Sequence, residues 1–240
     1  MDSQLETERR VHDFAKTQPW NHNFVLPNGV ETRKGDFSSP AKNSNKLSRL
    51  EQAFTALEIS GKKVLDVGCN EGFFSIELAK RGAIVTGLDA DANRIEKAKF
   101  IKEILAEELP ISYECNNFLE ENISIEPASV VLCLGFLHRV PDPITVVKKL
   151  SEIADTIVFE WKAEYASSIT SPSAIFSSQD VNESDPFGTE YWLLSVDALK
   201  RLLKRHGIEY TYLLPKGNGK REILVASRSP IIGLTIQDER

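Results

Sequence analysis

Residues 64–90 read VLDVGCNEGFFSIELAKRGAIVTGLDA, and this stretch decides the fold. A short apolar run, VLDV, is followed by a loop with two glycines, a helical pattern and a second apolar run that ends at Asp89. The two runs have the length and composition of buried strands, and a helix between parallel strands makes a right-handed crossover. The stretch therefore predicts two parallel strands with a ligand-binding loop after the first strand.

The same alternation continues along the chain. Further strands are expected at residues 111–116, 129–136, 156–161, 210–215 and 222–227. Further helices are expected at residues 46–59, 92–108, 143–153 and 195–208. The last two strands are joined by turn residues, which predicts an antiparallel pair. The fold class is therefore α/β: a doubly wound, mostly parallel sheet of seven strands with an antiparallel C-terminal strand pair.

The chain divides around this sheet. Residues 50–229 form the expected ligand-binding domain, preceded by residues 1–49 and followed by a tail at 230–240. Within residues 1–49 we expect a short amphipathic helix at 4–17 and an irregular lead-in that covers the substrate pocket. Residues 162–190 lack periodicity and are rich in serine, which predicts a lid or insertion.

Composition excludes several classes of protein. The chain has 29 lysine and arginine residues against 35 aspartate and glutamate residues, and this net charge of -6 argues against general affinity for nucleic-acid backbones. No apolar run reaches the roughly 18 residues of a membrane span, and the first residues lack the apolar core of a signal peptide. Cys69, Cys115 and Cys133 show no CxxC spacing and are interpreted as buried thiols. We expect a cytoplasmic protein with no membrane partner.

The loop after the first strand carries a charge pattern that selects its ligand. Its spacing, Gly68-x-Asn70-x-Gly72, departs from the G-x-G-x-x-G of dinucleotide sites and lacks the Gly-Lys-Ser/Thr of phosphate loops. Asp66 would repel a pyrophosphate but would favour an ammonium or a sulfonium. Asp89 follows near the ~20-residue offset at which an acid accepts hydrogen bonds from a ribose diol. S-adenosylmethionine combines an ammonium, a sulfonium and an unphosphorylated ribose.

This stretch resembles motif I and the acidic second motif of class I S-adenosylmethionine-dependent methyltransferases, over about residues 50–227. The resemblance implies that the loop backbone holds the methionine end, that Asp66 orders the loop or reaches the ammonium, and that Asp89 takes the ribose hydroxyls. The residue after the third strand would meet the adenine, and the end of the fourth would line the sulfonium side. The implied cofactor residues are Asp66, Gly68, Cys69, Asn70, Gly72, Phe73, Asp89, Ala90, Asn117, Phe118, Leu134 and Gly135. The alternative is that the two acids are loop caps.

The methyl acceptor is less clearly marked. Residues 133–143, CLGFLHRVPDP, resemble a segment of methyltransferases that act on small molecules, lipids and tRNA wobble uridines. His138 is a candidate general base, or a structural histidine bonded to backbone. Arg139 would orient an anionic substrate or cap the next helix. Glu160 is a second candidate base or a structural glutamate, and Trp161 would form a wall of the pocket.

The flanks resemble relatives of the tRNA wobble-uridine carboxymethyltransferase. Residues 19–33, PWNHNFVLPNGVETR, and residues 190–208, EYWLLSVDALKRLLKRHGI, carry this likeness. It implies that four residues fold over the acceptor pocket: Trp20, His22, Thr32 and Lys46. Of these, Trp20 and His22 are expected to contact the substrate. His138 stands where the carboxymethyltransferase has a tyrosine that contacts a carboxylated cofactor, so ordinary S-adenosylmethionine is expected.

Three functions remain in competition. The leading hypothesis is a methyltransferase for a small molecule, most simply an oxygen of a sugar or other metabolite. The second is a tRNA-modifying methyltransferase that uses a basic face of the 195–208 helix: Lys200, Arg201, Lys204 and Arg205. The third is a cofactor-binding partner subunit without catalysis. No metal is expected, because Asp142 and Glu160 alone do not make an octahedral oxygen site.

Overall fold

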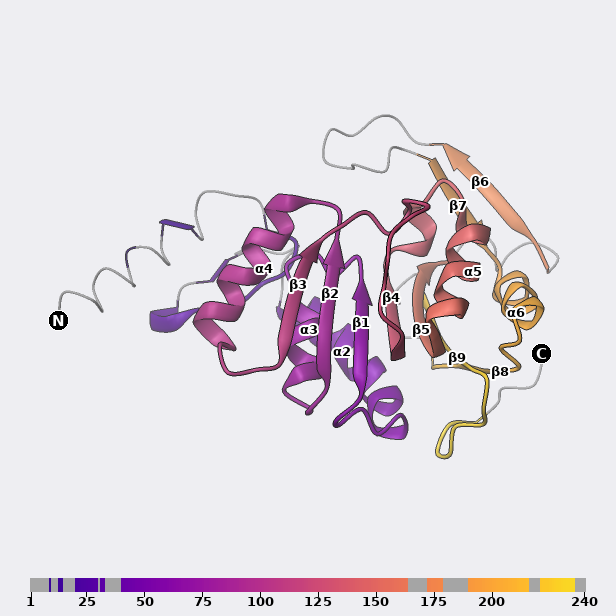
Figure 1. The fold of residues 1–240 in the computed structure, drawn as a ribbon, viewed down its shortest axis with the longest axis horizontal. Coiled ribbons are helices and arrows are strands. Elements are labelled where there is room, and N and C mark those ends of the chain that lie inside the picture. The colour runs from indigo at the N-terminus through magenta and orange to yellow at the C-terminus, as the bar shows by residue number, and fades with distance from the viewer. Residues whose placement is uncertain are drawn as a thin grey trace.

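Seven strands of the described chain form one sheet, in the order β3-β2-β1-β4-β5-β9-β8 (Figure 1). The structure is a computed structural model, and it describes residues 9, 13–14, 20–29, 31–32, 40–163, 172–178, 190–215 and 221–235. The strands of the sheet are β1 (Lys63–Val67), β2 (Ile84–Asp89), β3 (Ile111–Cys115), β4 (Ala128–Leu134), β5 (Ala154–Lys162), β8 (Tyr210–Leu213) and β9 (Arg221–Ser227). The first five pair in parallel, and β9 pairs antiparallel with both β5 and β8. The predicted fold class is confirmed.

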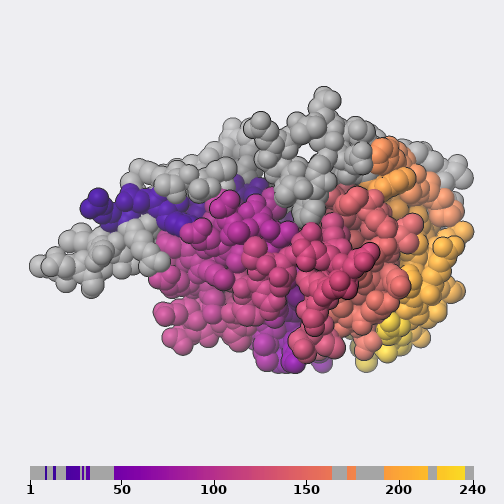
Figure 2. Space-filling model, turned by 45° about the horizontal axis from the view of Figure 1, so that its top comes forward, coloured from indigo at the N-terminus to yellow at the C-terminus, as the bar shows by residue number. Residues whose placement is uncertain are grey.

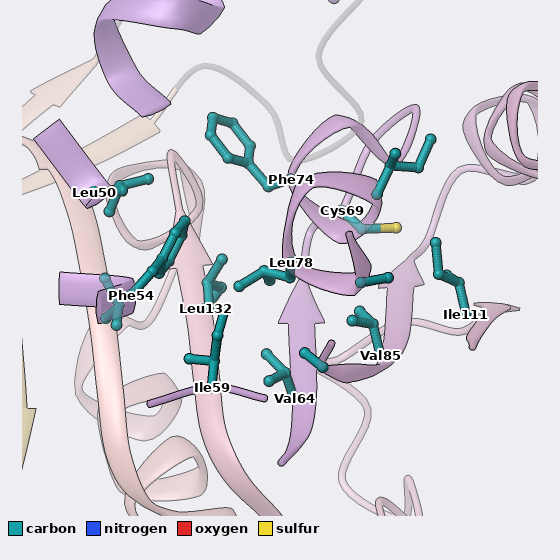
Figure 3. Packing of buried hydrophobic residues seen from close by; sticks show 14 of the residues in the cluster. Leu50, Phe54, Ile59, Val64, Cys69, Phe74, Leu78, Val85, Ile111 and Leu132 are labelled. Atoms are coloured by element: carbon teal, nitrogen blue, oxygen red, sulfur yellow. The ribbon is translucent and has the colours of Figure 1, made fainter. Parts of the chain in front are cut away.

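Helices cover both faces of this sheet. The α-helices are α2 (Pro40–Ala56), α3 (Phe73–Ala79), α4 (Ala92–Leu105), α5 (Pro143–Ile153) and α6 (Val196–Arg205), and the short 3-10 helices are η1 (Pro27–Gly29) and η3 (Leu137–Arg139). One core lies under α2, α3 and α4, and the other lies under α5 and α6. Figure 3 shows the first core, where Leu50 and Phe54 of α2 and Leu78 of α3 point toward Val64 and Leu132 of the sheet. Apolar positions three and four apart on each helix produce these buried faces.

The structure differs from the sequence predictions at two elements. Helix α2 begins at Pro40, six residues before the predicted start, because proline is favoured in the first turn, where its missing N–H costs nothing. Part of the 162–190 segment is ordered as a strand pair, in which β6 (Ala174–Ser178) runs antiparallel to β7 (Glu190–Leu194). The cross-strand rings of Phe176 and Trp192 lie 5.0 Å apart. The helix predicted at 4–17 lies mostly outside the described residues.

The order of the strands reverses at β1: β2 and β3 lie on one side of it, and β4 and β5 lie on the other. A crevice forms where strand order reverses, beyond the carboxyl ends of the two strands. The loops that leave β1 and β4 meet there, since a Cβ on Gly68 would lie 2.8 Å from the Phe136 ring. The β6–β7 pair stands at the same end of the sheet, packed on η3 (Figure 1).

The lead-in packs on the helices of the first core. Trp20, Phe24 and Leu26 are buried there, and Val25 bridges to Glu31 across a short turn. The ring of Phe14 stacks on Phe100 of α4 at 4.0 Å. Figure 2 shows the indigo surface of this segment at one end of the molecule, beside the magenta surface of the sheet's first half. The lead-in is therefore part of the folded body.

Candidate functional site

The loop after β1 needs a left-handed backbone at three positions. Gly68, Asn70 and Gly72 have φ angles of 70°, 55° and 78°. Glycine adopts such angles without strain, and asparagine tolerates them better than most residues. A side chain at Gly72 would also collide with Tyr113, whose hydroxyl oxygen lies 2.2 Å from where a Cβ would be. The backbone conformation and the internal packing of the loop therefore require glycine at positions 68 and 72.

Asp66 lies beneath this loop and is 3% exposed. Ser75 Oγ donates a hydrogen bond of 2.7 Å to its Oδ2. Burial raises the pKa of Asp66 to about 6, and the negative charge of Asp89 adds to this shift although the Ser75 hydrogen bond opposes it. A cation bound next to such a buried carboxylate stabilises its ionised form strongly, because the attraction between charges is weakly screened there.

Asp89 ends β2 and holds the loop from the other side. Its two oxygens accept the backbone N–H groups of Asn70 and Asp91, each at 3.0 Å. The Arg94 guanidinium lies 3.8 Å away. Burial raises the pKa of Asp89 in spite of these partners. A carboxylate has about four acceptor sites, so Asp89 keeps the capacity to accept hydrogen bonds from a diol.

A small hollow opens between these loops, at the end of β2. Its lining includes five of the predicted cofactor residues and three further residues: Gly68, Asp89, Ala90, Asn117, Phe118, Leu88, Asn116 and Phe136. The rings of Phe118 and Phe136 meet edge to face at 6.1 Å. Asn117 Oδ1 accepts the N–H of Leu119, which fixes its side chain at the rim. The lining of the hollow is mostly apolar with a polar edge, and its volume of about 10 Å³ is that of a single water molecule.

Three further predicted cofactor residues, Cys69, Leu134 and Gly135, are not among the residues that line this hollow. Cys69 is buried, and burial raises its thiol pKa well above the usual value. Leu134 ends β4 and Gly135 follows it, with the N–H of Gly135 donating to the carbonyl of Glu160. Of the other two thiols, Cys133 is buried, but Cys115 is exposed because it ends the edge strand β3, which corrects the prediction of a buried thiol there.

Glu71 is a site residue that sequence reasoning missed. It is fully buried in the loop, and its carboxylate accepts the backbone N–H groups of Asn21 (2.8 Å) and His22 (2.7 Å). Burial opposes its ionisation, but hydrogen bonds from His22 and Asn21 outweigh burial and lower the pKa of Glu71. The only sequence signal is an acid just before a helix, which is ordinary at a helix N-terminus. Its partners lie fifty residues earlier in the chain.

The lead-in is thereby attached directly to the loop. The His22 ring stacks on Phe73 with centroids 5.6 Å apart, and its Nδ1 lies 3.4 Å from Glu71 Oε2, at the outer limit of a hydrogen bond. Thr32 Oγ1 donates to the carbonyl of His22 and accepts the N–H of Phe24. Trp20 is 4% exposed and packs in the core, which favours a structural role over the predicted contact with the substrate.

A buried carboxylate marks the other side of the crevice. Glu160, near the end of β5, is 2% exposed and lies 3.2 Å from Lys46 Nζ and 2.8 Å from Arg221 Nη1. Burial opposes its ionisation, but the two cations outweigh burial and lower the pKa of Glu160. A doubly paired carboxylate is a weak base, so this geometry favours positioning of the cations over proton transfer.

His138 and Trp161 are held by the protein itself. His138 Nδ1 accepts the N–H of Lys162 at 3.3 Å. Burial and the nearby cations, Arg221 first, lower the pKa of His138 to about 2, so the ring is neutral at pH 7 and hard to protonate. Trp161 is fully buried, and its indole N–H donates to the carbonyl of Leu194 at 2.8 Å. These placements favour structural roles; the predicted roles in catalysis and substrate binding stay untested.

Two further predictions concern the surface. Leu199 and Leu203 of α6 are buried, and Lys204 lies 3.9 Å from Glu209, so the basic residues form the solvated side of an amphipathic helix. Binding of tRNA stays a prediction. Asp142 caps α5 by accepting the N–H groups of Ile144 and Thr145. No helix in the described ranges is both long enough and apolar enough to cross a membrane.

A mostly parallel seven-stranded sheet with an acidic glycine loop at its reversal point defines the Rossmann-like methyltransferase class. The chain belongs to the methyltransferase domain family, whose sequence model matches residues 40–213. The ubiquinone biosynthesis O-methyltransferase of Coxiella burnetii is 36% identical over 111 residues, which cover 46% of this chain and 45% of that protein. The enzyme of the same name from Pasteurella multocida is 36% identical over 124 residues, 48% of this chain and 50% of that protein. The match thus spans about half the length of these curated relatives.

Solved structures share the fold at low identity. The N-terminal domain of EvdMO1, crystallised in the presence of SAH and D-fucose, has a TM-score of 0.69 at 18% identity, covering 95% of this chain and 97% of that one. Magnesium protoporphyrin IX methyltransferase (ChlM) from Synechocystis, with bound SAM, has a TM-score of 0.57 at 19% identity, covering 82% and 87%. At such identities the likeness extends to the fold alone.

Proposed function

We propose that this protein is an S-adenosylmethionine-dependent methyltransferase that acts on an oxygen of a small-molecule metabolite. The observation that carries the proposal is the pair of buried carboxylates, Asp66 and Asp89, on either side of the glycine loop. Two acids there disfavour a phosphorylated ligand and suit a cationic nucleoside. The named relatives, which are O-methyltransferases, support oxygen as the target atom.

The residues at the crevice fit this cofactor. A Cβ at Gly68 or at Gly72 would fill space at 2.8 Å or 2.2 Å from an aromatic side chain, so both positions require bare backbone. Asp66 would face the ammonium, and Asp89 would accept the ribose hydroxyls. Phe118 and Phe136 would flank the adenine. When bound, S-adenosylmethionine supplies a methyl group already activated by a positive sulfur.

Besides binding the cofactor, the protein must align the acceptor with the methyl group. Displacement at the methyl carbon needs an acceptor oxygen in line with the leaving sulfur and a site from which water is excluded. The 20–32 lead-in is fixed to the cofactor loop through Glu71, and the β6–β7 pair stands on η3 at the same end of the sheet. These two segments would position the acceptor from opposite sides. A sugar is one candidate metabolite; the neighbour crystallised with D-fucose is consistent with it. We place the activity in the cytoplasm.

Calorimetry with S-adenosylhomocysteine tests the cofactor site. The wild-type chain should bind it, and Asp89→Ala should weaken binding at least tenfold, because a charge-assisted hydrogen bond is worth about 1.5–3 kcal/mol. Asp155→Ala is the matched control, since Asp155 is exposed at the opposite end of the sheet and pairs with Arg228 there. Transfer of a labelled methyl group into fractionated cell extract would then identify the acceptor. Tight binding of NAD or ATP with no binding of S-adenosylhomocysteine would refute the proposal.

A further inference from the structure

The Glu71 carboxylate joins three segments of the chain that are far apart in the sequence. Glu71 belongs to the loop after β1, and it accepts the backbone N–H groups of Asn21 (2.8 and 3.0 Å) and His22 (2.7 Å) from the lead-in. Lys97 of α4 lies 3.9 Å from its Oε1, and the Glu71 side chain is 0% exposed. Because a buried carboxylate has lost its water, these partners take the place of solvent. Loop, lead-in and α4 therefore meet at this one carboxylate.

Lys97 connects the lead-in to the same point a second time. It is 6% exposed, and its Nζ lies 5.2 Å from the centroid of the Trp20 ring. One buried ammonium thus contacts both the Glu71 carboxylate and an aromatic ring of the lead-in. Breaking a buried ion pair costs far more than breaking one at the surface, because water screens the buried charges little. The link between the lead-in and the loop is therefore part of the protein interior.

The lead-in also contacts two residues of the expected cofactor site. Asn21 Nδ2 donates to Asn70 Oδ1 at 3.3 Å, and the His22 ring stacks on Phe73 with centroids 5.6 Å apart. Asn70 has the left-handed backbone of the loop, and its own N–H donates to Asp89 Oδ2. The loop is thus held at Asn70 from two sides, by the lead-in through the side chain and by Asp89 through the backbone.

The turn that makes these contacts is bonded within itself. Thr32 Oγ1 accepts the N–H of Phe24 at 2.9 Å and donates to the carbonyl of His22 at 3.1 Å. The Phe24 ring lies 5.9 Å from the ring of Phe73, which begins α3 directly after the loop. Because one hydroxyl bonds both sides of the turn, the turn moves as a unit. A shift of the loop would therefore displace the lead-in, and the reverse holds as well.

We propose that Glu71 positions the cofactor loop for the methionine end of S-adenosylmethionine and couples that end to the lead-in. This inference rests on the proposed methyltransferase function and adds a positioning residue to it. The loop backbone is expected to hold the methionine end, whereas Asp89 and Phe118 are expected to hold the nucleoside. Loss of the Glu71 anchor should therefore weaken recognition of the amino-acid end and spare the nucleoside. Because coupling between two sites is reciprocal, a ligand with the amino-acid end should in turn stabilise the lead-in.

Two ligands, measured by calorimetry on the full chain, separate the two halves of the site. S-adenosylhomocysteine has the amino-acid end, and methylthioadenosine keeps the nucleoside and the sulfur but lacks that end. Glu71→Gln keeps the shape of the side chain and removes its charge. It should weaken binding of S-adenosylhomocysteine about fivefold or more and change binding of methylthioadenosine less than about twofold.

Three other variants complete this experiment. Asn21→Ala, which removes only a side-chain bond to the loop and serves if Glu71→Gln does not fold, should weaken S-adenosylhomocysteine alone, by about threefold. Asp89→Ala should weaken both ligands. Val25→Ala is the matched control in the same lead-in, at a residue that is 60% exposed, and should change neither. Equal loss of both ligands in Glu71→Gln, or unchanged affinity for S-adenosylhomocysteine, would overturn the proposal.

Amide hydrogen exchange tests the coupling in the wild-type chain itself. S-adenosylhomocysteine should slow exchange at Asn21 and His22, methylthioadenosine should not, and Glu71→Gln should remove the slowing. Exchange at these two amides that is the same with and without S-adenosylhomocysteine would contradict the coupling. Exchange decides alone if the wild type binds methylthioadenosine too weakly for calorimetry. A wild-type chain that binds neither ligand would instead refute the methyltransferase function.

Discussion

Asp66→Asn should make the protein more stable and less able to bind its cofactor. Asp66 is 3% exposed, and its pKa rises from 3.8 to about 6 on folding. A raised acid pKa means that the folded state favours the protonated form. The stability that Asp66 contributes is therefore present below pH 3.8 and is lost as the pH rises through 6. Asparagine keeps a neutral acceptor for Ser75 at every pH.

The size of the effect follows from the shift. A change of about two pKa units corresponds to roughly 3 kcal/mol of unfolding free energy at pH 8, and to about half of that at pH 5. Urea unfolding of the wild type and Asp66→Asn at both pH values measures this difference. Asp155→Asn, at a residue whose side chain is 82% exposed, removes the same charge and should leave the pH dependence unchanged.

Ionisation of Asp66 lowers the stability of the fold, but it should strengthen cofactor binding. A ligand ammonium prefers ionised Asp66, so the affinity of the wild type for S-adenosylhomocysteine should fall as the pH drops below about 6, and Asp66→Asn should bind weakly without this dependence. Calorimetry at pH 5, 6 and 8 measures it. The reasoning would be refuted if Asp66→Asn had wild-type affinity, or if its stability differed from wild type by the same amount at pH 5 and pH 8.

Three further substitutions test the site. Glu71→Ala should lower the free energy of unfolding by about 2 kcal/mol, because it leaves two partly buried backbone N–H groups without their acceptor. Amide exchange at Asn21 should accelerate; unchanged exchange would contradict the link to the lead-in. Gly72→Ala should lower the free energy of unfolding by more than about 2 kcal/mol, because the residue has a φ of 78° and a Cβ there would collide with the Tyr113 hydroxyl. Adding Tyr113→Phe should restore part of this stability; no recovery would place the strain in the backbone alone. Trp161→Phe should lower the free energy of unfolding by about 2 kcal/mol and change the KM for the acceptor little. A large change in that KM would support the predicted role of Trp161 as a wall of the acceptor pocket.

The cofactor half of the site could be predicted from the sequence because its determinants are local. Gly68, Asn70 and Gly72 signal a left-handed loop, and Asp66 and Asp89 end up beside it because adjacent parallel strands bring their carboxyl ends together. The strict alternation of strands and helices predicted the parallel sheet, but the order of its strands comes from the structure. Residues 174–178 and 190–194 escaped prediction as a pair, since alternation over five residues is a weak signal.

The acceptor half depends on contacts between distant segments, and sequence patterns contain no information on which distant charges meet. His138 and Trp161 read as pocket residues from their position after strands, but burial and hydrogen bonds to Lys162 and Leu194 turn both toward the protein interior. Glu71 reads as an ordinary acid, yet packing makes its carboxylate the anchor of the lead-in. The sequence by itself determined the sheet, the glycine loop and the two acids that select a cationic nucleoside, because local backbone preference and strand polarity set them. Only the tertiary structure decided the acceptor side, because α2, β5 and β9 bring Lys46, Glu160 and Arg221 together through long-range packing.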